Sequence, residues 1–159
     1  MPKRYLFLSL TVVIILFLVY VFGSSGLPRV YTLDMALKNR DYVSLHGTVY
    51  HADVFDAFFH SVQNGTDVGV RIVDFTVEGD PIITSVAYKE GRLTVTRDTT
   101  RDRFGAPTVT RMEYQNLLLY RDADAGREYF IATDLLEITP ESFQTDGIGD
   151  ILISRNASM

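Results

Sequence analysis

Residues 68–88, VGVRIVDFTVEGDPIITSVAY, predict two β-strands that meet at a tight turn, and this hairpin decides the fold. Apolar residues occupy both faces of the first strand, which is typical of a central, buried strand. The turn is expected at Glu78–Pro81, where Gly79 can adopt the positive φ that tight turns often require. Pro81 suits the start of the second strand, because it need not donate a backbone hydrogen bond there.

A helix is predicted before this hairpin and further strands after it. Apolar residues from Val54 to Val62 repeat at helical spacing behind Asp53, which is a candidate N-cap. The expected elements are helices over 33–38 and 54–62, strands over 42–45, 68–77, 82–88, 93–96, 108–120 and 128–133, a helical turn near Pro140, and an edge strand over 151–154.

This order of elements predicts an α+β domain. We expect one amphipathic helix to cover one face of an antiparallel meander of roughly four to six strands. The connections between the strands are short, and a parallel crossover needs about a dozen residues or more, so parallel pairs are not expected.

Residues 5–22, YLFLSLTVVIILFLVYVF, form an apolar stretch without charge, Gly or Pro. As a helix this stretch would span about 27 Å, close to the ~30 Å hydrocarbon core of a bilayer and longer than the core of a cleaved signal. Lys3 and Arg4 place the N-terminus in the cytoplasm by the positive-inside bias. The stretch therefore predicts a single-pass anchor with the domain outside. Cleavage near Gly23–Ser25 is the alternative and would give a secreted protein.

The chain accordingly divides into residues 1–22 (basic segment and membrane anchor, or signal peptide), 23–31 (linker), 32–154 (extracytoplasmic α+β domain) and 155–159 (tail). Lys3 and Arg4 contribute two positive charges to the net charge of −5, so residues 29–159 carry −7. Such an acidic domain argues against a nucleic-acid partner. The chain has no cysteine, which excludes disulfides, thiol nucleophiles and a lipid-modified cysteine. No phosphate-binding glycine loop is present, and we expect no cofactor.

Three segments resemble an uncharacterised bacterial family, domain-of-unknown-function family 4362. They are Asp41–Gly47 (DYVSLHG), Val77–Ile82 (VEGDPI) and Asp98–Gly105 (DTTRDRFG), in this order, and the resemblance covers roughly residues 33–133. It implies a small extracytoplasmic protein of Gram-positive bacteria, often a lipoprotein, without an established activity. The chain departs from that pattern because it lacks the lipoprotein cysteine and a cysteine expected near the strand over Glu128–Thr133.

The connection between Asp98 and Pro107 is long for a hairpin, which indicates a functional or mobile loop. Arg101 and Arg103 could clamp an anionic ligand, with Asp98 and Asp102 beside them. The alternative is a solvated network of ion pairs that contributes little to stability. His46, next to Gly47, joins these four residues as a candidate binding residue.

Asp74, Glu78 and Asp80 form the alternative candidate site, since paired carboxylates can perform acid–base chemistry on a glycosidic bond. The competing interpretation is that Glu78 and Asp80 belong to the turn and that Asp74 lies at a sheet edge or pairs with an arginine. The acids have no EF-hand spacing.

No catalytic residue is assigned, because the serine-nucleophile motifs are absent. His46, His51 and His60 lack a zinc-binding pattern, so no metal site is predicted. The sequence favours a membrane-anchored, non-enzymatic module that binds or modulates an envelope protein or glycan. The alternatives are a small carboxylate-dependent hydrolase of an envelope glycan and a purely structural envelope component.

Overall fold

The computed structural model describes residues 30–145 and 147–157. The predicted anchor over 5–22 and the cleavage positions at 23–25 lie outside the described residues. Within the described part of the chain, no helix is long and apolar enough to cross a membrane. Tyr31, which the sequence places in the linker, already contacts the domain, because its hydroxyl accepts a hydrogen bond from Arg71 Nη1 at 3.0 Å.

Three helices lie in the described residues: α2 (Leu33–Lys38), α3 (Ala52–Gln63) and α4 (Pro140–Phe143). Thr32 caps α2 by accepting a hydrogen bond from Met35 N at 3.3 Å. The start of α3 differs from the prediction. Its N-cap is His51 at φ +55°, and the His51 side chain contacts Asp41 O at 3.0 Å instead of the helix. Asp53 lies within the first turn and pairs with Arg40.

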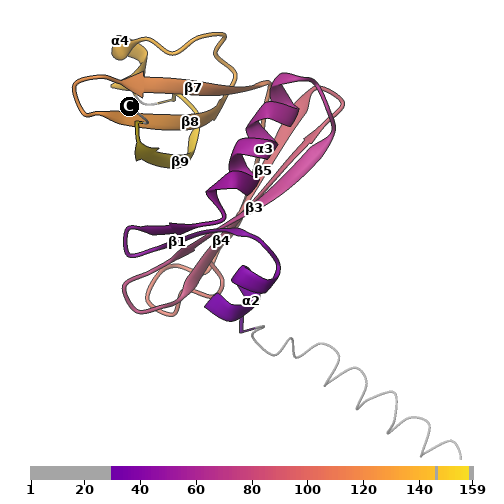
Figure 1. The fold of residues 1–159 in the computed structure, drawn as a ribbon, viewed down its shortest axis with the longest axis vertical. Helices are drawn as coiled ribbons and strands as arrows, with labels where there is room; N and C mark the ends of the chain where they lie inside the picture. The colour runs from indigo at the N-terminus through magenta and orange to yellow at the C-terminus, as the bar shows by residue number, and fades with distance from the viewer. Residues whose placement is uncertain (1–29, 146, 158–159) are drawn as a thin grey trace, which may run out of the picture. The chain divides into compact units, whose positions relative to one another are not determined.

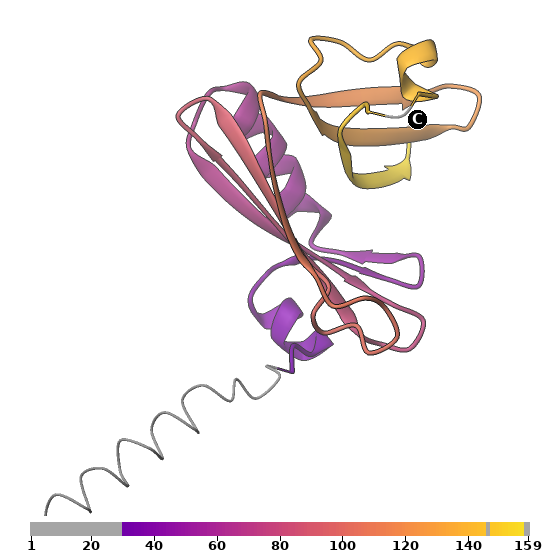
Figure 2. The same ribbon diagram turned by 180° about the vertical axis from the view of Figure 1, so that it is seen from behind.

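The strands form two sheets (Figures 1 and 2). The larger sheet has the order β2-β1-β3-β4-β5-β6 and the smaller has the order β7-β8-β9. The larger sheet contains β1 (Tyr42–Leu45), β2 (Thr48–Tyr50), β3 (Val68–Phe75), β4 (Pro81–Lys89), β5 (Arg92–Asp98) and β6 (Val109–Tyr114); the smaller contains β7 (Asn116–Asp122), β8 (Arg127–Thr133) and β9 (Asp150–Asn156).

The α+β class is confirmed, but the expectation of one antiparallel meander is wrong. β1 and β3 are parallel, with Tyr42 beside Ile72 and Ser44 beside Asp74. The connection from β1 to β3 includes β2 and α3, so it has the length that a parallel crossover requires. The short strand β2 was not predicted. It pairs with β1 through a turn in which His46 and Gly47 both have positive φ, +48° and +86°.

The strand predicted over 108–120 is two strands in different sheets. β6 ends at Tyr114 and β7 begins at Asn116. Gln115 separates them, and its backbone N–H donates to Asp134 Oδ1 at 3.0 Å instead of joining a ladder. The last strand also extends further than expected, so Arg155 and Asn156 belong to β9 and not to the tail.

Two hydrophobic cores cover opposite faces of the larger sheet. α2 packs on one face, where Ala36 contacts Val43, Val73 and Ile83. On the other face α3 and the smaller sheet share a core around Phe55, which lies 5.8 Å from Tyr42 and 5.1 Å from Phe130 between ring centroids. Because this second core includes residues of both sheets, it holds them together beside α3.

Candidate functional site

Three connections of the larger sheet lie at one end of the molecule, which we call the loop end (Figures 1 and 2). They are the β1–β2 turn at His46–Gly47, the β3–β4 turn over 76–80 and the β5–β6 loop over 99–108. Each includes part of one of the three segments that carry the family resemblance. His46 Nε2 lies 3.1 Å from Thr76 O, which ties the first connection to the second.

Asp80 and Arg103 join the second connection to the third. Asp80, only 7% exposed, accepts hydrogen bonds from Arg103 N at 3.0 Å and from Arg103 Nε at 2.9 Å. These bonds from Arg103 hold the pKa of the Asp80 carboxyl below its ordinary value. The β5–β6 loop is therefore fixed against the β3–β4 turn by a bond to a charged group.

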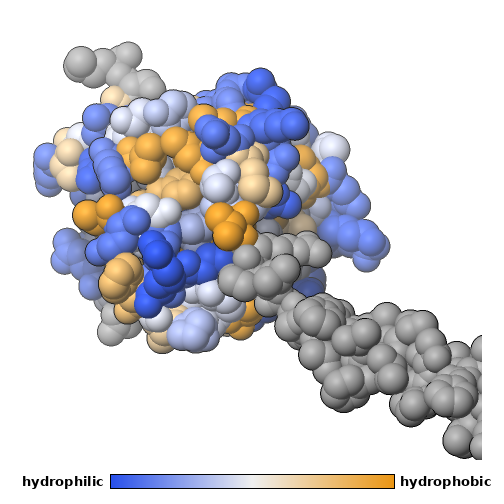
Figure 3. Space-filling model, turned by 90° about the horizontal axis from the view of Figure 1, so that it is seen from below, coloured by the Kyte–Doolittle hydropathy of each residue, from blue (hydrophilic) through white to orange (hydrophobic). Residues whose placement is uncertain are grey.

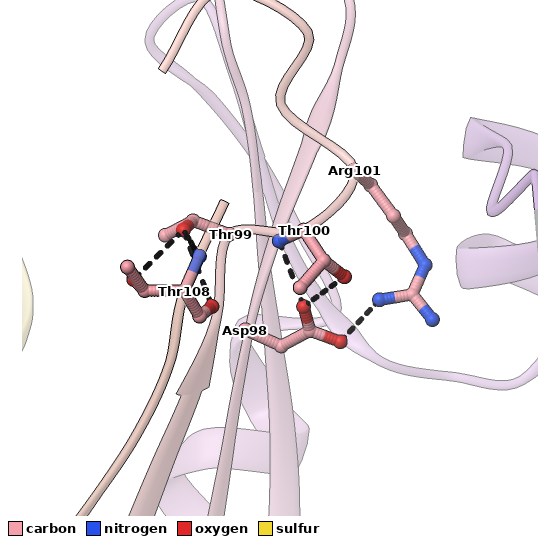
Figure 4. A network of polar contacts seen from close by, with 5 residues as sticks. All are labelled: Asp98, Thr99, Thr100, Arg101 and Thr108. Carbon is pink, nitrogen blue, oxygen red and sulfur yellow. Dashed lines mark hydrogen bonds and ion pairs between the residues drawn. The ribbon is translucent and has the colours of Figure 1, made fainter. Parts of the chain in front are cut away.

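Asp98 organises the start of the same loop (Figure 4). It accepts a hydrogen bond from Thr100 N at 2.9 Å and forms an ion pair with Arg101. Burial raises the pKa of Asp98, but the hydrogen bonds from Thr100 and Arg101 outweigh burial, so its pKa lies below the ordinary value. At the base of the loop, Thr99 N donates to Thr108 O at 2.9 Å.

Asp102 turns the chain at the tip of the loop. Its Oδ1 accepts hydrogen bonds from Phe104 N at 2.9 Å and from Gly105 N at 3.0 Å. A Cβ at Gly105 would lie 2.4 Å from Asp102 Oδ2, so a side chain at this position would displace the Asp102 carboxylate. The five predicted binding residues thus lie at one end of the molecule, and both arginines contact carboxylates of the same chain.

The predicted acid cluster is not brought together. Glu78 is exposed in the β3–β4 turn, Asp80 faces the β5–β6 loop, and Asp74 lies within β3. The turn is closed by Gly79 N, which donates to Thr76 O at 2.9 Å, so it begins two residues before the predicted position. Gly79 has φ +85°, and Pro81 is the first residue of β4.

A second feature, which the sequence did not predict, is a cavity of about 580 Å³ between the two sheets. Tyr42, Ser44 and Asp74 line it from the larger sheet, while Ile151–Asn156 line it from β9. Side chains of a strand alternate between its two faces, so six consecutive lining residues mean that the cavity follows the edge of β9. Among the described residues β9 pairs with β8 alone, which leaves that edge open.

The electrostatics of the cavity depend on Asp74. Burial raises the pKa of Asp74, and the hydrogen bond with Ser44 and the charge of Arg97 offset this only in part. Burial and the nearby charge of Asp74 also raise the pKa of the Tyr42 hydroxyl. The pKa values of a carboxyl group and a phenol in the cavity are thus both raised, and burial is the main cause of each shift.

Two arginines line the opposite wall of the cavity. Arg155 is held by Glu128, with Nε to Oε2 at 3.1 Å, and by Asp56, with Nη1 to Oδ1 at 2.7 Å. Hydrogen bonds from Arg121 and then from Arg155 hold the pKa of Glu128 below its ordinary value, although burial opposes them. Arg127 differs, since it donates to Ser154 Oγ at 3.2 Å and has no carboxylate partner among the described residues.

No group of metal-ligating side chains gathers in the described ranges. The three histidines lie apart: His46 contacts the β3–β4 turn, His51 begins α3, and His60 packs beside Phe59. Sequence reasoning missed Tyr42, Ser44 and Arg127, because the cavity depends on the parallel pairing of β1 and β3 and on the second sheet. One residue could have indicated the cavity from the sequence. Arg155 places a charge two residues after Ile153, on a face of β9 that is otherwise apolar.

Comparison with known proteins gives one family. The family model described as domain of unknown function (DUF4362) matches residues 39–127, which is more than half of the chain. The matched range contains the loop end and the Tyr42, Ser44 and Asp74 wall of the cavity, but it ends before most of β8 and all of β9. No curated protein and no solved structure matches the chain.

Proposed function

We propose that this chain, which belongs to the DUF4362 family, is a membrane-anchored extracytoplasmic module of the bacterial envelope that binds an extended peptide beside β9. The anchor is the apolar stretch over 5–22, with Lys3 and Arg4 on its cytoplasmic side. The observation that carries the binding function is the cavity along the open edge of β9.

The open edge of β9 favours a peptide over a glycan. The outward N–H and C=O groups of an edge strand can pair with an added strand, and such main-chain bonds provide affinity. The exposed side chains of Val49 and Ile151, at 42% and 45%, line the cavity and offer apolar contacts to alternate peptide side chains. Arg127 suits an acidic side chain or a C-terminal carboxylate, since it lacks a carboxylate partner among the described residues.

One observation supports the alternative, a hydrolase. Asp74 lies in the cavity with a raised pKa, as the general acid of a glycosidase requires. Glycoside hydrolysis commonly uses two carboxylates about 5–9.5 Å apart. Among the described residues that line the cavity, Asp74 is the single carboxylate, and this favours binding over catalysis.

The binding function is tested by capture from envelope fractions with the detergent-solubilised full chain as bait. Ile151→Lys puts a charge into the cavity, and Leu136→Lys is its matched control because Leu136 is 89% exposed and does not line the cavity. We expect a peptide or protein captured by the wild type to be lost with Ile151→Lys and retained with Leu136→Lys. Equal capture by both variants would show that the cavity is not the binding site.

The hydrolase is tested with isolated peptidoglycan as substrate. Release of reducing sugars by the wild type, and its loss with Asp74→Asn, would replace the binding function with the catalytic one. We expect no release from either protein, because a partner carboxylate is missing from the described lining.

A further inference from the structure

The β5–β6 loop leads into a long exposed and uncharged run. All seven residues from Phe104 to Thr110 (FGAPTVT) are exposed, and none of them carries a charge. Phe104 is 74% exposed and Val109 is 61% exposed, while Val77 at the neighbouring β3–β4 turn is 85% exposed. Tips of hairpins are normally polar, so apolar side chains at two adjacent tips point to an apolar environment for them.

The same end of the molecule contains the first described element, α2 (Figures 1 and 2). Met35 on α2 adds another exposed hydrophobic side chain there, at 44%. Figure 3 views the molecule from this side, and hydrophobic groups lie on that face among hydrophilic ones. The apolar tips therefore lie at the end of the domain where its described elements begin.

We infer that the loop end rests on the outer surface of the bilayer, with Phe104 and Val77 in the headgroup region. This inference rests on the proposed membrane anchor. Eight residues lie between Phe22, the last residue of the apolar stretch, and Tyr31. At most ~3.3–3.6 Å per residue, that tether reaches about 30 Å, so the domain remains within roughly its own diameter of the membrane.

The charges at this end fit an interface with lipid headgroups. The Arg103 guanidinium lies 5.9 Å from the centre of the Phe104 ring, and its side chain is 71% exposed although it is bonded to Asp80. An aromatic ring beside a cation is typical of side chains at a membrane surface. Exposed charges of both signs, such as Glu78 and Lys38, also occur there, so apolar contact and not net charge must provide the attraction.

Hydrogen bonds and ion pairs of the β5–β6 loop fix the conformation in which Phe104 would meet the lipid headgroups. Asp80 fixes Arg103, Asp98 pairs with Arg101, and Asp102 bonds the amides of Phe104 and Gly105. The loop conformation is thus held by the protein itself, and presenting Phe104 to lipid requires no further ordering of the chain.

The chain contains no tryptophan, so a single introduced tryptophan reports its own environment. The full-length Phe104→Trp variant is reconstituted in phosphatidylcholine vesicles, with and without bromine on the acyl chains. The control is Leu136→Trp, since Leu136 is 89% exposed and follows β8 in the other sheet. Val77→Trp provides a second position at the loop end should Phe104→Trp fold poorly.

We expect a blue-shifted emission and a loss of intensity in brominated vesicles for Trp at position 104 or 77, and neither effect for position 136. Emission at 104 and 77 that matches position 136, in vesicles that retain the protein, would overturn the inference while leaving the anchor intact. Release of the protein from the vesicles by alkaline carbonate would instead refute the anchor, and the inference with it.

Discussion

Phe55→Ala tests whether the two sheets are held together by one aromatic core. Phe55 is 0% exposed and touches Tyr42 of the larger sheet and Phe130 of the smaller one. Truncation of a buried phenylalanine costs about 3–5 kcal/mol, because apolar burial is lost and a cavity remains. Domains of this size are stable by about 5–15 kcal/mol, so the variant should lose about a fifth or more of its stability.

The assay is equilibrium unfolding in urea, followed by far-ultraviolet circular dichroism, with Val77→Ala as control. Val77 is 85% exposed, so its truncation should change the free energy of unfolding by no more than about 0.5 kcal/mol. A shared core predicts a single transition in both variants and a clearly lower midpoint for Phe55→Ala. A loss below about 1 kcal/mol, or separate transitions for the two sheets, would refute the shared core.

Three further predictions concern single residues. Gly149→Ala should lower the melting temperature more than Gly79→Ala: both have positive φ, +113° and +85°, but a Cβ at 149 would lie 2.0 Å from a backbone oxygen, and one at 79 meets nothing within 4 Å. Asp74→Asn should stabilise the fold at neutral pH and not below about pH 3. The pKa of Asp74 is raised in the fold, so its charge destabilises the protein as pH rises above about 3.9, the ordinary pKa of an aspartate. An equal change in melting temperature at both pH values would contradict this pH dependence. Glu128→Gln should make the melting temperature fall less between neutral and acid pH than it does in the wild type. The lowered pKa of Glu128 stabilises the fold above the unfolded pKa, and this stability is lost as pH falls through the folded pKa. The same pH dependence of the melting temperature in variant and wild type would exclude that contribution.

Local features of the fold were predictable because they depend on near neighbours in the chain. The hairpin strands around Gly79 and the apolar face of α3, with Phe55 and Phe58 buried, follow from periodicity and turn chemistry. The break at Gln115 was not predictable, because the residue that accepts its amide is Asp134, nineteen positions away. The parallel pair β1–β3 was hidden for a similar reason, since β2 is short and fully exposed.

The candidate sites show the same difference between features that depend on near neighbours in the chain and features that depend on distant residues. The β5–β6 loop was predicted as one candidate binding segment because Asp98, Arg101 and Arg103 are near neighbours in the sequence. The bond from Arg103 to Asp80, which defines how that loop sits, joins residues 23 positions apart. The cavity was missed because its walls come from residues 42–74 and 127–156, and no local pattern relates these two ranges.

Hydrogen exchange of the full chain, with and without the molecules captured from envelope fractions, tests the proposed binding mode most directly. Amides that bond to an added strand exchange more slowly, so a strand added at the open edge of β9 predicts new protection within Ile151–Asn156. Protection confined to the β5–β6 loop over 99–108, or no new protection anywhere, would contradict it.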